Sequence, residues 1–185
     1  MKYEISQEQY ASFLNSLTYD QQLNRTANPP NSASGTLAIA GALESRNGIK
    51  IETSGVINNV PAVYGCDLNG NGTFNEADDG QNIACNWLSW PDLIAYLDWS
   101  ALRPMTEFEF EKICRGPVYP FAGEYAWGTT DLLQAQSGEL NNAGLASEAS
   151  ILAGAGLCSY GINNTDNGPL RCGFAATTST SRILA

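Results

Sequence analysis

The chain has 185 residues, of which 43% are hydrophobic, and its nineteen acidic and nine basic residues give a formal net charge of -10 at pH 7. This length and composition fit a single domain with a sizeable core. The negative charge would repel a phosphate backbone, so nucleic acid is excluded as an expected partner. Histidine is absent, which excludes conventional hydrolytic triads and every zinc site that contains it.

The first predicted element is a helix that begins after Ser6. Ser6 and Gln9 have the spacing of a capping box, and apolar side chains follow at i, i+3, i+4 and i+7, namely Tyr10, Phe13, Leu14 and Leu17. We expect this helix to pack one face inward.

Residues 24–86 form an elaborated loop region, in which Ile49 to Ile51 resembles a strand. Within it, the run from Asp67 to Asp79 resembles a calcium loop of the EF-hand or dockerin type, with glycine at position 6. The expected oxygen ligands are Asp67, Asn69, Asn71, Thr73, Asn75 and Asp78. The alternative is a turn-rich Asn-Gly loop that binds no metal, because amides replace carboxylates at positions 3 and 5. Calcium is the only cofactor that we expect.

The five cysteines contain no C-x-x-C pair, so neither a zinc ribbon nor a thioredoxin-type site is indicated. Cys66 and Cys85 bracket the calcium-like loop, and either a disulfide or two buried thiols would suit them. The pairing of these two cysteines with Cys158 or Cys172 also stays open. Cys114 is expected to lie in the core.

Two further helices are predicted. One begins at Ser89, has Pro91 in its first turn and ends near Ser100. The other begins at Thr106, which forms a capping box with Glu109, and ends at Gly116. We expect this last helix to bury the face formed by Phe110, Ile113 and Cys114. Its alternating glutamates are explained by capping and by the helix dipole rather than by acid chemistry.

The segment WLSWPDLIAYLDWSALRPMTEFEFEKICRG (87–116), followed by YAWG (125–128), resembles the formylglycine-generating-enzyme and sulfatase-modifying-factor family. KYEISQEQYASFLN (2–15) resembles the family's opening strand and helix. The resemblance implies a C-type-lectin-like fold and places the tryptophans Trp87, Trp90, Trp99 and Trp127 in the core rather than in a sugar-stacking site. The matching residues of the third helix and its flanks are Arg103, Thr106, Glu107, Glu109, Glu111, Arg115 and Gly116.

The segments DDGQNIACNWLSW and GPLRCGFAATTSTSRILA add a closer resemblance to the variable proteins of diversity-generating retroelements from gut bacteria and phages. These proteins use the fold to display a hypervariable ligand-binding surface. The family's enzymes use a cysteine pair and copper, and no pair in this chain matches that pattern. We expect the natural polypeptide to continue beyond residue 185, because the chain stops in an apparent strand with no turn or cap after it.

The sequence thus predicts a single α+β, C-type-lectin-like domain over residues 1–185, truncated at its C-terminus and rich in loops. Two or three helices should pack on a small, mostly antiparallel sheet. The expected function is a non-catalytic binding scaffold on a virion or cell surface, whose partner is a protein or glycan receptor on another cell. The alternatives are a copper oxidase of formylglycine-generating type whose catalytic cysteines lie beyond this chain, and a structural surface or secretion component of the same fold. No stretch has the roughly 18 to 20 apolar residues that span a bilayer, so no membrane span is expected.

Overall fold

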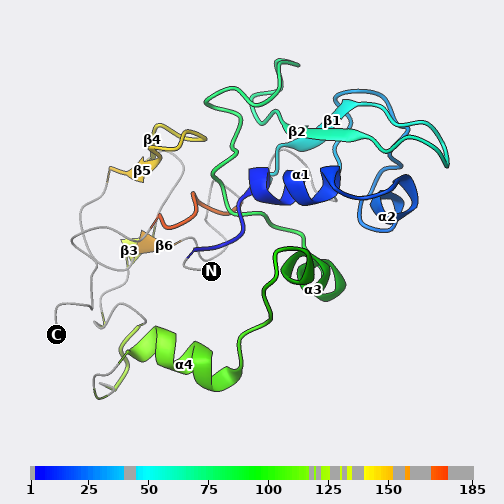
Figure 1. Cartoon of the computed structure of the whole chain (residues 1–185). Coiled ribbons are helices and arrows are strands. Elements are labelled where there is room, and N and C mark those ends of the chain that lie inside the picture. The colour runs from blue at the N-terminus through cyan, green and yellow to red at the C-terminus, as the bar shows by residue number, and fades with distance from the viewer. Residues whose placement is uncertain are drawn as a thin grey trace.

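The computed structural model describes residues 3–39, 45–116, 119, 122–125, 130, 133–134, 140–151, 157–158 and 168–174. Helices and very small sheets alternate along the chain, which confirms the α+β class (Figure 1). The helices are α1 (Gln7–Asn15), α2 (Tyr19–Leu23), α3 (Trp90–Trp99) and α4 (Glu107–Arg115). The strands are β1 (Ile49–Thr53), β2 (Val63–Cys66), β3 (Leu133–Gln134), β4 (Leu140–Asn141), β5 (Ala149–Ser150) and β6 (Leu157–Cys158).

Three two-stranded sheets are formed among the described residues. β1 pairs with β2 and β4 with β5 in antiparallel fashion, while β3 and β6 run parallel. Residues 35–38 hydrogen-bond to the free edge of β1, where the Gly35 amide donates to the Ile51 carbonyl at 2.8 Å. The region predicted to be an elaborated loop therefore contributes the longest pair of strands among the described residues, with Ile49 and Ile51 fully buried.

Helix α1 packs against β2, and together with β1 they enclose the main core (Figure 1). The predicted capping box is present: the Ser6 hydroxyl accepts from the Gln9 amide, and the Gln9 side chain accepts from the Ser6 amide. Tyr10, Phe13 and Leu14 are buried, as the spacing predicted. The core is thus built on the inward face of α1.

Two side-chain amides beside this core hydrogen-bond to backbone groups, as a neighbouring β-strand would. The Asn15 side chain donates to the Tyr64 carbonyl at 2.9 Å and accepts from the Tyr64 amide at 2.8 Å. Gln22, which is fully buried in α2, does the same with both backbone groups of Ala62. Each side chain satisfies an inward-facing donor and acceptor that would otherwise be buried without a partner.

Helix α3 completes the aromatic part of the core. Its N-terminus has a capping box of Ser89 and Asp92, and Asp92 also forms an ion pair with Arg25 at 2.9 Å. The Tyr96 ring packs edge-on against the Phe13 ring, with centroids 5.8 Å apart. The ion pair and the ring contact fix α3 against the end of α1 and the turn after α2.

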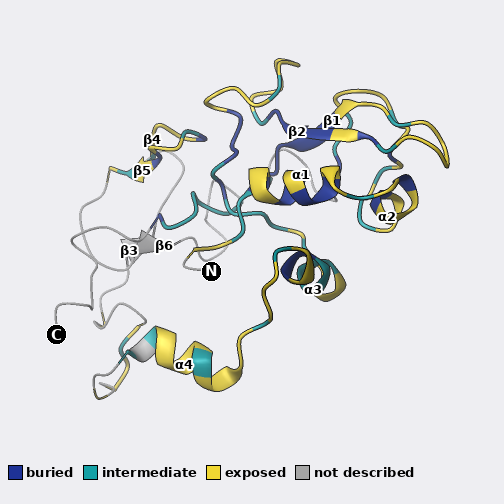
Figure 2. Cartoon of the chain, in the orientation of Figure 1, coloured by how far each residue is buried: buried dark blue, intermediate teal, exposed yellow. Residues whose placement is uncertain are grey.

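Helix α4 begins as predicted, with the Thr106 hydroxyl accepting from the Glu109 amide. Its apolar face is not buried, however: Phe110 is 56% exposed and Ile113 is 68% exposed, while Cys114 is half-buried (Figure 2). The expectation of an inward face was wrong because α4 lies apart from α1 and the β1–β2 pair (Figure 1). Periodicity identifies the apolar face of a helix but not the element that covers it.

A buried carboxylate outside the main core also connects separate segments of the chain. Glu148 is fully buried and accepts from the Arg46 guanidinium, from the Gly144 amide at 2.9 Å and from the Arg171 amide at 2.9 Å. The carboxylate therefore joins three segments that are distant in sequence.

No helix in the described ranges has the length and hydropathy needed to cross a bilayer.

Candidate functional site

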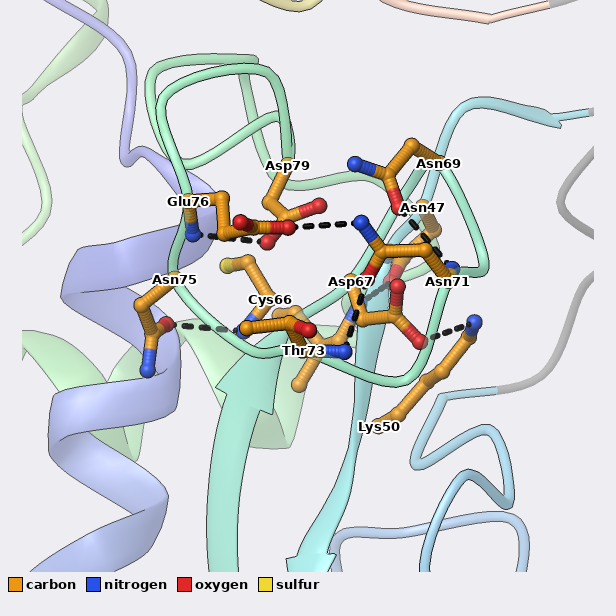
Figure 3. Close-up of polar contacts among 12 residues, drawn as sticks. Asn47, Lys50, Cys66, Asp67, Asn69, Asn71, Thr73, Asn75, Glu76 and Asp79 are labelled. Atoms are coloured by element: carbon orange, nitrogen blue, oxygen red, sulfur yellow. Dashed lines mark hydrogen bonds and ion pairs between the residues drawn. The ribbon is translucent and has the colours of Figure 1, made fainter.

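The turn after β2, residues 67–81, contains all six predicted calcium ligands (Figure 3). Its backbone is folded by short polar contacts: the side-chain Oδ1 atom of Asn69 accepts from the Asn71 backbone amide at 2.9 Å, and the Oδ1 atom of Asn71 accepts from the Thr73 backbone amide at 2.7 Å. Gly70 and Gly72 have positive φ angles of 74° and 83°, which L side chains rarely adopt. The pattern of asparagine and glycine thus specifies a tight turn by itself.

The predicted ligands do not all converge. Asn75 accepts from the Cys66 amide at 3.0 Å, and Asp78 is exposed and accepts from the Asn69 side-chain amide at 3.1 Å. The Thr73 side chain is exposed at the outer edge of the turn. Among the described residues, no three His, Cys, Asp or Glu side chains gather as a metal-binding group.

Asp67 stands apart from the other predicted ligands because it is 2% exposed. Its Oδ2 atom forms an ion pair with the buried Lys50 ammonium at 2.8 Å. Its Oδ1 atom is also buried and has no hydrogen-bond partner. One oxygen of this carboxylate is therefore compensated and the other is not.

Asp79, which was not among the predicted ligands, is the second buried carboxylate of the turn. It is fully buried, its Oδ2 atom accepts from the Glu76 amide at 2.7 Å, and its Oδ1 atom has no partner. Burial raises the pKa of this carboxyl group, and the negative charges of Asp67, Asp78 and Glu76 raise it further. The Gln81 Oε1 atom, two residues later, is a third buried oxygen without a partner. Position 12 of the loop pattern is Asp78, which is exposed, whereas the next residue, Asp79, is buried.

A separate apolar surface lies along α3, α4 and their connection. We define the α3–α4 surface by Trp90, Leu102, Met105, Phe108 and Ile113, which are 63%, 41%, 52%, 87% and 68% exposed. A groove of about 500 Å³ runs between residues 3–5, α3 and the connection, and a second of about 660 Å³ lies along α4. Both grooves are lined mainly by apolar side chains.

The tryptophans do not occupy the core positions that the resemblance implied. Trp87 is 57% exposed and Trp90 is 63% exposed, while Trp99, 47% exposed, packs one ring face near Phe13 with centroids 5.6 Å apart. The side chain of Trp127 lies outside the described residues. The exposed rings enlarge the apolar surface instead of filling the interior.

The described cysteines form no disulfide with one another. Cys66 is buried, while Cys85, Cys114 and Cys172 are half-buried. Burial raises the pKa of Cys66 to about 12 and that of Cys172 to about 11. Burial also raises the pKa of Cys85, with smaller contributions from the neighbouring Cys66 and Cys172 thiols. The side chain of Cys158 lies outside the described residues.

Three polar residues around the start of α4 bond to one another. Arg103 forms a two-pronged contact with the Glu109 carboxylate, at 2.8 and 2.6 Å, and Glu109 also accepts from the Thr106 amide at 2.8 Å. These bonds lower the pKa of Glu109 to about 2, the Arg103 hydrogen bonds being the largest cause. A carboxylate held ionised in this way has no proton to donate at neutral pH.

In comparisons with known proteins, no family model, no curated protein and no solved structure matches this chain.

Proposed function

We propose that this chain is a non-catalytic binding scaffold with a C-type-lectin-like fold, closest in type to the variable proteins of diversity-generating retroelements. The observation that carries the proposal is the use of Arg103, Thr106 and Glu109, the residues of the family resemblance, to cap and brace α4. Their mutual bonds support a role in holding the fold rather than in acting on a substrate.

The thiols of Cys66, Cys85 and Cys172 give the chain no activated nucleophile, which supports a non-catalytic scaffold. A thiolate, not a thiol, is the nucleophile and metal ligand. Since the pKa values of Cys66 and Cys172 lie at about 12 and about 11, these groups are protonated at neutral pH. Burial also raises the pKa of Cys85, so this thiol is protonated as well.

The α3–α4 surface supports a protein receptor over a glycan as the partner of the described part of the molecule. Exposed apolar patches mark interaction sites, and aromatic residues are enriched in protein interfaces. Glycan sites combine a ring face with polar groups, whereas the groove beside Trp90 is lined mainly by side chains such as Leu97 and Met105. A cell-surface or virion location follows from such a receptor role.

A turnover assay tests the non-catalytic proposal. The full chain would be incubated with copper, oxygen and a cysteine-containing peptide, and conversion of the cysteine to formylglycine would be followed by mass spectrometry. We expect no conversion above that in a reaction without protein. Conversion that depends on the chain and is lost in Cys66→Ser or Cys85→Ser would overturn the proposal, while the exposed-site variant Ser12→Ala serves as the matched control.

A further inference from the structure

The turn at residues 67–81 has more acidic than basic side chains, and some of its carboxylates are buried. It contains the carboxylates of Asp67, Glu76, Asp78 and Asp79. Among the described residues, the cation that pairs with one of them is Lys50, which lies in β1 and pairs with Asp67. Asp67 and Asp79 are 2% and 0% exposed. A buried carboxylate without a cation is costly, and it is relieved either by a proton or by a bound positive ion.

Two oxygens in the turn are available to such an ion. Asp67 Oδ1 and Asp79 Oδ1 are both buried and without hydrogen-bond partners. Figure 3 shows the two carboxylates within the turn, Asp79 on the side of Glu76 and Asp67 on the side of Lys50. Hydrogen bonds to Lys50 and to the Glu76 amide hold the second oxygen of each carboxylate, so each group is oriented by one oxygen and offers the other.

The donor chemistry fits Ca²⁺ better than other common ions. Calcium takes six to eight oxygen ligands, including carboxylates, amide and backbone carbonyl oxygens and water, in flexible geometry. The turn offers carboxylate and amide oxygens and has no thiol or imidazole among its residues. Transition metals such as zinc prefer nitrogen and sulfur, and magnesium requires near-ideal octahedral geometry.

We propose that the turn binds one Ca²⁺ ion through Asp67 Oδ1 and Asp79 Oδ1, with amide and carbonyl oxygens of the turn and water completing the shell. Asp79 thereby replaces Asp78 as the second anionic ligand. Since the charge of Asp67 is already paired with Lys50, the ion offsets the buried negative charge of Asp79, and it connects the turn to the end of β2, which carries Cys66 at the edge of the main core. This site is independent of the receptor-binding role proposed above.

Calcium titration of the full chain tests the site. The protein is freed of metal with a chelator, and binding is followed by calorimetry and by the melting temperature. Since only two carboxylates ligate, we expect a dissociation constant on the order of 10⁻⁵ to 10⁻³ M and a weaker response to Mg²⁺. Asp79→Asn keeps the shape of the side chain and should weaken calcium binding at least ~10-fold, because it removes one of two anionic ligands.

The control variant is Asp98→Asn, which removes the same charge from an exposed position at the end of α3. We expect its calcium affinity to stay within about twofold of the parent chain. In metal-free buffer, Asp79→Asn should melt no lower than the parent, which shows that it folds. The proposal is overturned if calcium gives neither binding heat nor a shift in melting temperature at ~10 mM, or if Asp79→Asn and Asp98→Asn bind calcium equally.

Discussion

Helices α1 and α4 both begin with a capping box, but the apolar face of α1 is buried and that of α4 is exposed. In α1 the Ser6 side chain accepts from the Gln9 amide at 3.2 Å, and in α4 the Thr106 side chain accepts from the Glu109 amide at 3.2 Å. Yet Phe13 in α1 is 2% exposed, whereas Phe108 in α4 is 87% exposed (Figure 2). Local signals thus decide where a helix starts, while distant segments decide whether its face is covered.

The largest expected effect is a difference in the free energy of unfolding when one phenylalanine of each helix is replaced by alanine. Phe13→Ala should lower the free energy of unfolding by about 3 to 5 kcal/mol, because it opens a cavity among Tyr10, Tyr96 and Trp99. Phe108→Ala should change it by less than about 0.5 kcal/mol, since the side chain is exposed. Urea unfolding followed by fluorescence measures both. Equal losses would mean that α4 is packed as tightly as α1.

The next effect tests the amide side chains that replace strands. Gln22→Leu has nearly the same volume but leaves both backbone groups of Ala62 and the Leu14 carbonyl without these partners. We expect a loss of about 1 to 3 kcal/mol in the free energy of unfolding. The exposed neighbour Leu23 offers a control, because Leu23→Gln removes no buried hydrogen bond. A neutral Gln22→Leu would contradict the role given to the amide.

Removing the two caps gives a smaller contrast. Ser6→Ala should cost about 1 kcal/mol of global stability, because α1 is part of the main core. Thr106→Ala should reduce helicity by circular dichroism, with a smaller change in the global unfolding midpoint. If the two variants shifted the midpoint equally, α4 would unfold together with the core and the contrast would fail.

The smallest effect is a pH dependence of α4. The folded-state pKa of Glu109 is about 2, below its usual value of 4.5, so its contribution is complete above 4.5 and is lost as the pH falls toward 2. We expect part of the helical signal to decrease over this interval. In Glu109→Gln this decrease should be absent, whereas Glu107→Gln should retain it. A pH profile unchanged by Glu109→Gln would refute the assignment.

Much of the fold could be predicted from local sequence. The capping boxes at Ser6 and Thr106 and the proline in the first turn of α3 fixed three helix starts, because such signals act within a few residues. Helix α2 was missed because only five residues form it, although Thr18 and Gln21 make the same box. The outward face of α4 could not be predicted, since nothing in a periodic pattern identifies a covering segment.

The turn that contains the candidate site could be predicted from its sequence, but the burial of its side chains could not. The spacing of Asp67, Asn69 and Asn71 located the turn, but it did not show that Asp79 is buried while Asp78 is exposed. Burial of one of two adjacent aspartates depends on how the chain leaves the turn, which spacing alone does not fix. The ion pair of Lys50 with Asp67 joins two strands and likewise leaves no mark in the local pattern.

The central claim, a scaffold for diversified binding, is tested most directly by sequencing the gene and its neighbourhood in several isolates. We predict a reverse transcriptase gene nearby, a near-copy template repeat, and variation confined to one segment of the reading frame while the core residues Phe13 and Ile51 stay constant. An invariant reading frame that encodes a cysteine pair of the copper-oxidase type would contradict the claim.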